Sequence, residues 1–225
     1  MANARKRDFF SLILLIVLLS DSYTTTAVEF ELLKLVLQWP NSYCSLSKRP
    51  CRRKPLPSDF TIHGLWPDNR SWPLYNCQFD FDIPEVGDQK FRQKLDVIWP
   101  DLRLKRKRDP EQGFWITEWK RHGSCALPDI SFIDYFTTAT RLNKKFNIRD
   151  ILGRGKLYPG DSYDLQQVES TLTKFIKKVT VVKCPNGFLT EVIVCFDPSG
   201  TSIIDCPGPY PCTYVTVNFP KAVKR

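Results

Sequence analysis

The sequence predicts an α+β fold that is stapled by disulfides and built on a single domain. Apolar residues recur at three and four positions in the middle of the chain, whereas strand-like runs lie toward both ends. These helical and strand-like segments do not alternate regularly, which argues against a doubly wound parallel sheet. The chain has eight cysteines, and all of them follow the first 27 residues.

The first 27 residues differ in character from the rest of the chain. Residues 1–27 are predicted to be a secretory signal peptide, because a basic start precedes an apolar run from Phe9 to Leu19 and then small and polar residues. That run is shorter than the roughly 20 residues of a membrane-spanning helix, so an anchor is the weaker alternative. We expect residues 28–225 to form one secreted domain, with no stable membrane association.

The elements of that domain follow from local patterns. Asp88 is a candidate N-cap for the first helical segment, and Pro40 is expected to end the first strand. Helical spacing marks three segments, at residues 88–100, 130–146 and 165–179. Strand-like runs cover residues 34–40, 190–197 and 212–220.

The cysteines predict four disulfides and no zinc site. An even cysteine count behind a signal peptide is typical of a disulfide framework. A zinc site would need paired or histidine-rich spacing, but the sequence contains no Cys-x-x-Cys pair. Spacing alone leaves the pairing of the eight cysteines open.

The charge balance favours a polyanionic partner. The chain carries a formal net charge of +9, and residues 28–225 keep 30 Lys and Arg against 22 Asp and Glu. Nucleic acid, an acidic glycan or anionic lipid would each suit this excess. The basic run at residues 103–108 is interpreted as a solvated loop, as an RNA-tracking surface or as a protein-docking surface. Asn69 lies in an Asn-Arg-Ser sequon and is a predicted glycosylation site.

Both histidines are followed by glycine and lie near tryptophan. His63 interrupts the apolar segment TIHGLWP, and His122 follows Glu118 by four positions, so a helix would place these two on one face. With Arg121, these groups could perform acid–base chemistry on a phosphate. The alternative is that each ring only satisfies a backbone carbonyl. Gly123 is expected to end the helix.

Two segments, FTIHGLWPDN and FWITEWKRHGSC, resemble the active-site segments of the ribonuclease T2 family. LVLQWPNSYC resembles the family's first strand, and VCFDPSGTSIIDCPGPYPC resembles its last cysteine region. The resemblance covers essentially all of residues 28–225 and is greatest to the plant branch. The basic charge is most similar to that of the stylar self-incompatibility ribonucleases (S-RNases). The resemblance to the family implies a mostly antiparallel central sheet packed with several helices.

The resemblance also implies roles for the residues around the histidines. His63 and His122 match the catalytic histidines, with His122 assigned as base and His63 as acid. Glu118 matches a glutamate that stabilises the transition state, and Arg121 replaces the usual lysine with the charge retained. Thr117 stands where many members have an auxiliary, phosphate-holding histidine, and it brings no positive charge.

The resemblance also implies which residues bind the bases of the substrate and how the cysteines are paired. Trp66, Asp68 and Phe114 match residues that line a base-binding pocket, and Gln38 matches a strand residue near the other base site. The implied disulfides are Cys44–Cys51, Cys77–Cys125, Cys184–Cys212 and Cys195–Cys206.

The expected function is that of a secreted endoribonuclease that cleaves single-stranded RNA. The ribose 2′-hydroxyl attacks the adjacent phosphorus and leaves a 2′,3′-cyclic phosphate, so neither a metal nor another cofactor is expected. The resemblance favours a self-incompatibility S-RNase, for which a pollen F-box protein is the expected partner of a monomer. The alternatives are an S-like defence or phosphate-scavenging ribonuclease, and a silent RNA-binding or storage protein. A membrane-active or glycan-binding defence protein rests on charge alone.

Overall fold

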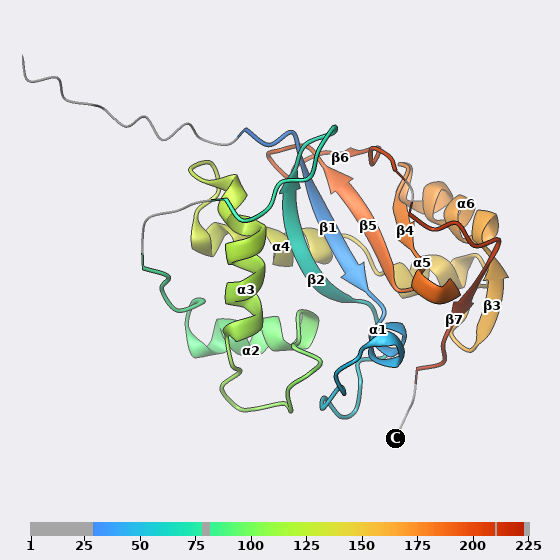
Figure 1. Ribbon diagram of the computed structural model, residues 1–225, viewed down its shortest axis with the longest axis horizontal. Helices are drawn as coiled ribbons and strands as arrows, with labels where there is room; N and C mark the ends of the chain where they lie inside the picture. Colours follow the sequence, from blue (N-terminus) through green and yellow to red (C-terminus); the bar gives the residue numbers. More distant parts are fainter. Residues whose placement is uncertain (1–28, 78–81, 210, 223–225) are drawn as a thin grey trace, which may run out of the picture.

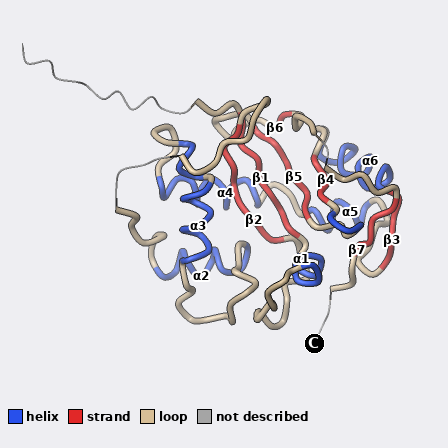
Figure 2. Tube along the Cα trace, in the orientation of Figure 1, coloured by secondary structure: helices blue, strands red, loops and turns tan. Residues whose placement is uncertain are grey.

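The computed structural model describes residues 29–77, 82–209 and 211–222, and an antiparallel five-stranded sheet forms its centre (Figures 1 and 2). The strands of this sheet are β1 (Leu32–Gln38), β2 (Thr61–Asp68), β4 (Val181–Lys183), β5 (Glu191–Phe196) and β6 (Ile203–Ile204). The strand order is β2-β1-β5-β4, and β6 pairs with β5. A second sheet pairs β3 (Asp161–Asp164) with β7 (Thr216–Phe219). The predicted α+β class and antiparallel central sheet are confirmed.

Helices surround the central sheet on several sides. They are α1 (Pro40–Leu46), α2 (Gln89–Ile98), α3 (Gly113–Arg121), α4 (Phe132–Asn143), α5 (Ile148–Arg154) and α6 (Leu165–Ile176). Helix α4 packs against β1 and β2, while α2 and α3 lie beside the β2 edge of the sheet (Figure 1). Helices α5 and α6 pack together near the small sheet at the opposite end. The predicted signal peptide lies outside the described residues.

The two faces of β1 have different surroundings, because successive side chains of a strand point to opposite faces of the sheet. Leu33, Leu35 and Leu37 point into the main core and are fully buried. The intervening Lys34 and Gln38 face the other side, where each lines a separate surface cavity. The strand therefore packs into the main core with one face. Its other face adds Leu32 and Val36 to a second buried apolar cluster and places Lys34 and Gln38 at the two cavities.

Aromatic side chains dominate the core between the sheet and α4. Trp99, Trp119, Tyr135 and Phe136 are completely buried, and Tyr135 contacts the other three rings at centroid distances of 5.0–5.9 Å. Burying one large apolar side chain stabilises a fold by about 1.5–3 kcal/mol. This cluster therefore anchors α2 and α3 to α4 through buried aromatic contacts.

The three helices that the spacing predicted are confirmed as α2, α4 and α6. Asp88 caps α2, because its carboxylate accepts a hydrogen bond from the Phe91 backbone amide. Pro40 does not simply end the first strand, since it occupies the first turn of α1, where its missing N–H is no loss. Helices α1 and α5, with seven residues each, and the strands β3, β4 and β6 were not predicted. These elements are too short to show a clear period.

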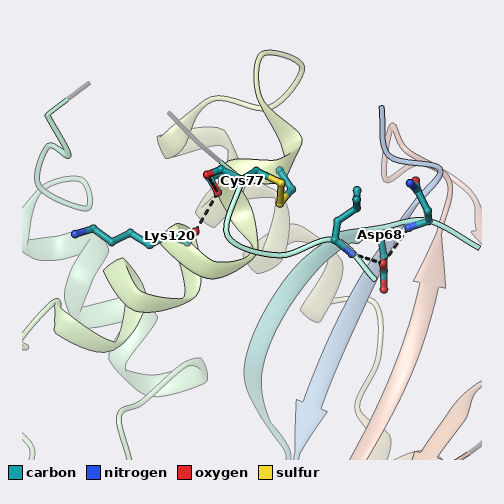
Figure 3. Close-up of a disulfide and its surroundings, with 7 residues drawn as sticks. Asp68, Cys77 and Lys120 are labelled. Atoms are coloured by element: carbon teal, nitrogen blue, oxygen red, sulfur yellow. Dashed lines mark hydrogen bonds between the residues drawn. A yellow bond between two sulfur atoms is a disulfide. The ribbon is translucent and has the colours of Figure 1, made fainter. Parts of the chain in front are cut away.

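All eight cysteines are paired as the resemblance implied, in Cys44–Cys51, Cys77–Cys125, Cys184–Cys212 and Cys195–Cys206. Figure 3 shows Cys77–Cys125, which joins the segment after β2 to the short 3-10 helix that follows α3. Ser124 Oγ lies 3.0 Å from the carbonyl oxygens of both Cys77 and Lys120. The disulfide and this hydroxyl fix the end of α3 against the loop from β2.

Candidate active site

His63 occupies an irregular point in β2. Val36 of β1 pairs with Gly64 and Leu37 pairs with Ile62, so His63 is an extra residue in the ladder. Such a bulge changes the direction of a side chain and is common beside active sites. The His63 carbonyl, freed from the ladder, accepts a hydrogen bond of 2.8 Å from Trp99 Nε1. The core thus holds the backbone that carries this imidazole.

Glu191 orients the His63 ring. The imidazole Nδ1 lies 2.6 Å from Glu191 Oε1, and the other carboxylate oxygen of Glu191 lies 2.9 Å from Lys183 Nζ. The Nε2 atom points toward Glu118 Oε1 at 3.8 Å, which is too long for a hydrogen bond. A proton on Nε2 is therefore available to a molecule in the cleft.

Trp66 connects the two histidines and the glutamate. Its ring stacks on His122 with centroids 4.5 Å apart and meets His63 edge-on at 5.5 Å. Its Nε1 donates a hydrogen bond of 3.0 Å to Glu118 Oε2, and Lys183 Nζ lies 4.8 Å from its centroid. Trp66 is thus a scaffold for the catalytic candidates as well as a wall of the site.

Helix α3 supplies the opposite wall. Glu118 is buried, and Arg121, on the last turn, is exposed toward the cleft. His122 is the C-cap residue, and its backbone amide donates to the Glu118 carbonyl at 2.9 Å. The pattern that placed Glu118 and His122 on one helix face therefore holds to the end of α3.

The two glycines after the histidines leave space for neighbouring side chains. A Cβ on Gly64 would lie 2.3 Å from Trp66 Nε1 and 2.4 Å from Glu118 Oε2. A Cβ on Gly123 would lie 2.4 Å from the ring of Trp119. Gly123 follows the helix end as expected, but close packing explains it, since its φ lies outside the left-handed region.

The two histidines have opposite electrostatic surroundings. Burial disfavours the imidazolium of His63, yet the hydrogen bond and charge of Glu191, with a contribution from Glu118, raise the pKa of His63 above its ordinary value. Burial, Arg121 and His63 instead lower the pKa of His122 to about 3, although the Leu74 backbone partly opposes this. The surroundings therefore favour the protonated form of His63 and the neutral form of His122.

The pKa values of the two carboxylates, Glu118 and Glu191, are also shifted in opposite directions. Burial raises the pKa of Glu118, and His63, Trp66 and Arg121 only partly offset that effect. Burial would raise the pKa of Glu191 too, but its hydrogen bond to His63 and the Lys183 charge lower it to about 2. Glu191 is therefore a permanent anion that partners His63.

Two surface cavities meet at these groups, and both are lined by His63, Glu118 and Arg121. We call them the tryptophan cavity, of about 560 Å³, and the glutamine cavity, of about 450 Å³. The tryptophan cavity is also lined by Lys34, Trp66, Asp68, Leu74, Tyr75, His122 and Lys183, among others. The glutamine cavity is also lined by Gln38, Tyr43, Asp101, Arg103, Phe114 and Thr117, among others. This arrangement suits one reacting bond flanked by two bound groups.

The structure divides the substrate-binding candidates differently from the sequence interpretation. Phe114 was grouped with Trp66 and Asp68, but it lines the glutamine cavity together with Gln38. The reason is that Phe114 begins α3, far from the His122 end, and stacks against His63 at 6.3 Å. Gln38 is buried, and its Oε1 has no hydrogen-bond partner within the described residues.

Thr117 lines the glutamine cavity and is exposed. Its hydroxyl donates a hydrogen bond of 2.7 Å to the Gly113 carbonyl, one turn earlier in α3. The hydroxyl proton is thus already used within the helix. In this rotamer, Thr117 offers only acceptor capacity to the cavity.

Asp68 lies in the wall of the tryptophan cavity but is largely engaged by the chain itself. Its Oδ1 accepts hydrogen bonds from the backbone amides of Asn69 and Leu74, both at 2.9 Å (Figure 3). Its Oδ2 forms an ion pair with Lys34. Asp68 therefore shapes the loop that carries Asn69 and bounds the cavity.

Sequence reasoning missed Glu191 and Lys183. Both lie in the central sheet, where Lys183 pairs directly with Glu191 across β4 and β5. One signal was present, because a glutamate at the start of an otherwise apolar strand is rarely buried without a charged partner. Its partners could not be named, since His63 is 128 positions away in the sequence.

The described residues contain no group of three or more His, Cys, Asp or Glu side chains arranged to hold a metal ion. None of the helices in this part of the chain combines the length and apolar character that crossing a membrane requires.

The site combines a buried carboxylate, an exposed guanidinium and two differently tuned imidazoles in an antiparallel, disulfide-bonded fold, which suits an acid–base enzyme. Residues 30–206 match the ribonuclease T2 family, and the chain belongs to this family. It is a T2-family ribonuclease, closely related to S-RNases.

The relatives support this placement at the level of both sequence and structure. Ribonuclease S-2 of Antirrhinum hispanicum is 53% identical over 230 residues, which cover 100% of this chain and 98% of the relative. Ribonuclease S-6 of Nicotiana alata is 37% identical over 81% of this chain and 84% of the relative. The crystal structure of the self-incompatibility-associated SF11-RNase of Nicotiana alata matches with a TM-score of 0.77 and 33% identity, over 86% of this chain and 100% of that one.

Proposed function

We propose that this ribonuclease cleaves single-stranded RNA by transphosphorylation, with His122 as the base and His63 as the acid. His122 takes the proton of the ribose 2′-hydroxyl, whose oxygen bonds to the adjacent phosphorus. The bond from phosphorus to the 5′-oxygen breaks, and His63 Nε2 gives that oxygen a proton. The products are a 2′,3′-cyclic phosphate and a free 5′-hydroxyl. The observation that carries this assignment is the contact of His63 Nδ1 with Glu191, because it leaves Nε2 as the proton donor in the cleft.

Glu118 and Arg121 are assigned to the pentacovalent phosphorus. The Arg121 guanidinium lies where the two cavities meet and can hold two phosphoryl oxygens at once. Glu118, whose raised pKa favours its protonated form more than usual, can share a proton with a third oxygen. Gln38, Phe114, Trp66 and Asp68 bound the spaces on either side for the two bases.

A purified-protein assay tests this reaction. A short RNA with a single ribose, at the scissile position of an otherwise 2′-deoxy oligomer, should be cut to a cyclic phosphate in the presence of EDTA. The all-deoxy oligomer should be inert. His63→Ala and His122→Ala should each lower kcat by about a hundredfold to ten-thousandfold, and the double variant should be little worse, since the two residues act as a unit. Wild type as slow as either variant would instead indicate a silent RNA-binding or storage protein.

The setting that we propose is secretion and self-incompatibility. The names of the S-ribonuclease relatives and of the self-incompatibility-associated structure support this role, and the basic charge is consistent with it. Residues 1–27 act as the signal peptide, Asn69 carries a glycan and the mature protein is a monomer that meets a pollen F-box protein. Expression of the full chain in plant cells should yield extracellular protein that begins near Val28 and loses mass on enzymatic deglycosylation. Pistils that express it should reject pollen of one haplotype only; an S-like defence or phosphate-scavenging enzyme would not discriminate.

A further inference from the structure

A third cavity continues the cleft beyond the glutamine cavity. It measures about 580 Å³ and is lined by Tyr43, Leu46, Ser47, Lys48, Arg49, Arg103, Pro185 and Thr190. Tyr43 and Arg103 line both this cavity and the glutamine cavity, so the two are contiguous. The Arg103 guanidinium lies over the Tyr43 ring, 5.9 Å from its centroid. We call this space the basic cavity.

The charge of the basic cavity has one sign. Three of its lining residues are cations and none is a carboxylate. Within the described part of the chain, no ion pair joins Lys48, Arg49 or Arg103 to an acidic side chain. Lys48 and Arg49 come from the segment after α1, whereas Arg103 comes from the segment between α2 and α3. The fold thus brings two distant basic segments to one site.

The rest of the basic run at residues 103–108 does not share this position. Lys105, Arg106, Lys107 and Arg108 are exposed and line neither the glutamine cavity nor the basic cavity. Lys107 forms an ion pair with Glu111, four positions on. Of the run that the sequence marked as RNA-tracking or protein-docking, only Arg103 therefore borders the cleft.

The two histidines set the direction in which RNA lies. His122 lines the tryptophan cavity and not the glutamine cavity, whereas His63 lines both. The base must reach the 2′-hydroxyl of the upstream nucleoside, which places that nucleoside in the tryptophan cavity. The downstream nucleoside, whose 5′-oxygen receives the proton of His63, then lies in the glutamine cavity. Its 3′ end points onward, toward the basic cavity.

We propose that the basic cavity binds the phosphate on the 3′ side of the downstream nucleoside, as a third subsite for single-stranded RNA. This inference rests on the proposed function. Lys48 and Arg49 contact the phosphate oxygens, and Tyr43, held by Arg103, separates the downstream base from the next one. RNA extended past the downstream nucleoside is therefore a better substrate than a dinucleotide, because the added phosphate meets cations that have no acidic partner within the described residues.

The test uses three substrates that each contain one cleavable bond, because all other riboses are 2′-deoxy. They are a dinucleoside monophosphate, a trinucleotide extended on the 3′ side and a trinucleotide extended on the 5′ side. In wild type, the 3′ extension should raise kcat/KM about twofold to fivefold, the range expected for one partly exposed ionic contact. The 5′ extension should raise it less.

The variant Lys48→Ala/Arg49→Ala should abolish the gain from the 3′ extension and leave cleavage of the dinucleotide unchanged. The control Lys105→Ala/Arg106→Ala removes the same charge from outside the cavities and should keep the gain. The salt dependence of cleavage of the 3′-extended substrate should also become shallower in the first variant only, because one phosphate contact is lost.

Three outcomes would overturn the subsite. They are equal rates for the dinucleotide and the 3′-extended substrate in wild type, equal losses in the two charge variants, and a loss on the dinucleotide as large as that on the trinucleotide. A cavity that serves a protein partner would give the first of these. Failure of the proposed function would look different, because wild type would then cut none of the three substrates.

Discussion

At the scale of single residues, the difference between the two imidazoles is decisive. A carboxylate bonded to His63 favours its charged form, while burial and the neighbouring Arg121 disfavour the charged form of His122. Two histidines with the same ordinary pKa are thereby shifted in opposite directions, which suits the proton donor and the proton acceptor that we propose. Glu191 lines neither of the two proposed nucleotide cavities. It contacts His63 instead, and we therefore assign it as a positioning residue for the proposed donor.

The pH profile of kcat/KM should be broad and displaced in a definite way. Activity needs His122 neutral, so the acidic limb should follow its lowered pKa, well below the ordinary histidine value. Activity also needs His63 protonated, so the alkaline limb should lie above the ordinary value, because the pKa of His63 is raised. Initial rates on one RNA substrate from pH 3 to pH 9 would measure both limbs. An alkaline limb below the ordinary histidine value would contradict the assignment.

Glu191→Gln should move the alkaline limb to lower pH. The amide keeps an acceptor for His63 Nδ1 but loses the negative charge, so only the smaller contribution of Glu118 would then oppose the lowering of the His63 pKa by burial. At pH 8 we expect a loss of about tenfold or more in kcat/KM, and a smaller loss at pH 5. Glu169→Gln, a carboxylate on α6 outside both nucleotide cavities, is the control and should leave the profile unchanged. An equal loss at every pH would mean that Glu191 is only structural.

Thr117→His should tighten substrate binding without replacing either catalytic histidine. The new imidazole would add a cation beside the glutamine cavity at mildly acidic pH, so KM should fall by about threefold, most strongly below pH 6. Thr117→Val is the matched control. Because the native hydroxyl donates to Gly113, its removal should change kcat/KM by no more than about twofold. A large loss in the valine variant would show that the hydroxyl serves the substrate.

At the scale of elements, the β2 bulge and the α3 terminus bring the catalytic groups together. Ile62 and Leu65 both face the core although they are three positions apart, which is possible in a strand only if one residue is extra. That residue is His63, and it turns toward the cleft. Glu118 reaches Trp66 across a space that Gly64 keeps open.

Gly64→Ala should therefore damage the site more than the fold. The added methyl group would displace Trp66 Nε1 and Glu118, so kcat should fall by about tenfold or more while circular dichroism stays native-like. Gly153→Ala, within α5 and outside both nucleotide cavities, adds the same atom at ordinary contact distance, 3.4 Å from the Tyr158 ring. It should preserve activity and stabilise by up to about 1 kcal/mol. Equal activity of the two variants would contradict the close contact at Gly64.

At the scale of the whole molecule, the staples secure a sheet whose catalytic residues come from distant segments. Cys77–Cys125 closes a loop of 48 positions around the helix that carries Glu118 and Arg121, whereas Cys44–Cys51 closes one of 7. In the chain-entropy description, a longer closed loop restricts the unfolded chain more and stabilises the fold more.

Removal of Cys77–Cys125 by paired alanine substitution should lower the free energy of unfolding by about 4 kcal/mol, against about 2.5 kcal/mol for Cys44–Cys51. Denaturant unfolding of the two variants measures the difference. The first variant should also lose activity, because the disulfide fixes the loop from β2 against the end of α3 (Figure 3). A smaller effect for Cys77–Cys125 than for Cys44–Cys51 would count against this account.

The sequence by itself determined the elements with a strong local pattern and the two segments in which the candidate site residues lie. Three amphipathic helices, the Asp88 cap and the two histidine segments are local features, since each depends on residues within a few turns of one another. The disulfide pairing followed from the family resemblance, because eight cysteines alone allow many pairings.

Only the tertiary structure decided how these groups work together. The bulge at His63, the partnership with Glu191 and Lys183, the position of Phe114 beside Gln38 and the inward hydrogen bond of Thr117 depend on strand register and helix packing. His63 and Glu191 lie 128 positions apart and meet because β1 pairs with β2 on one side and β5 on the other. Such contacts are set by long-range pairing of strands, and no local period in a sequence records which distant residues will share a face.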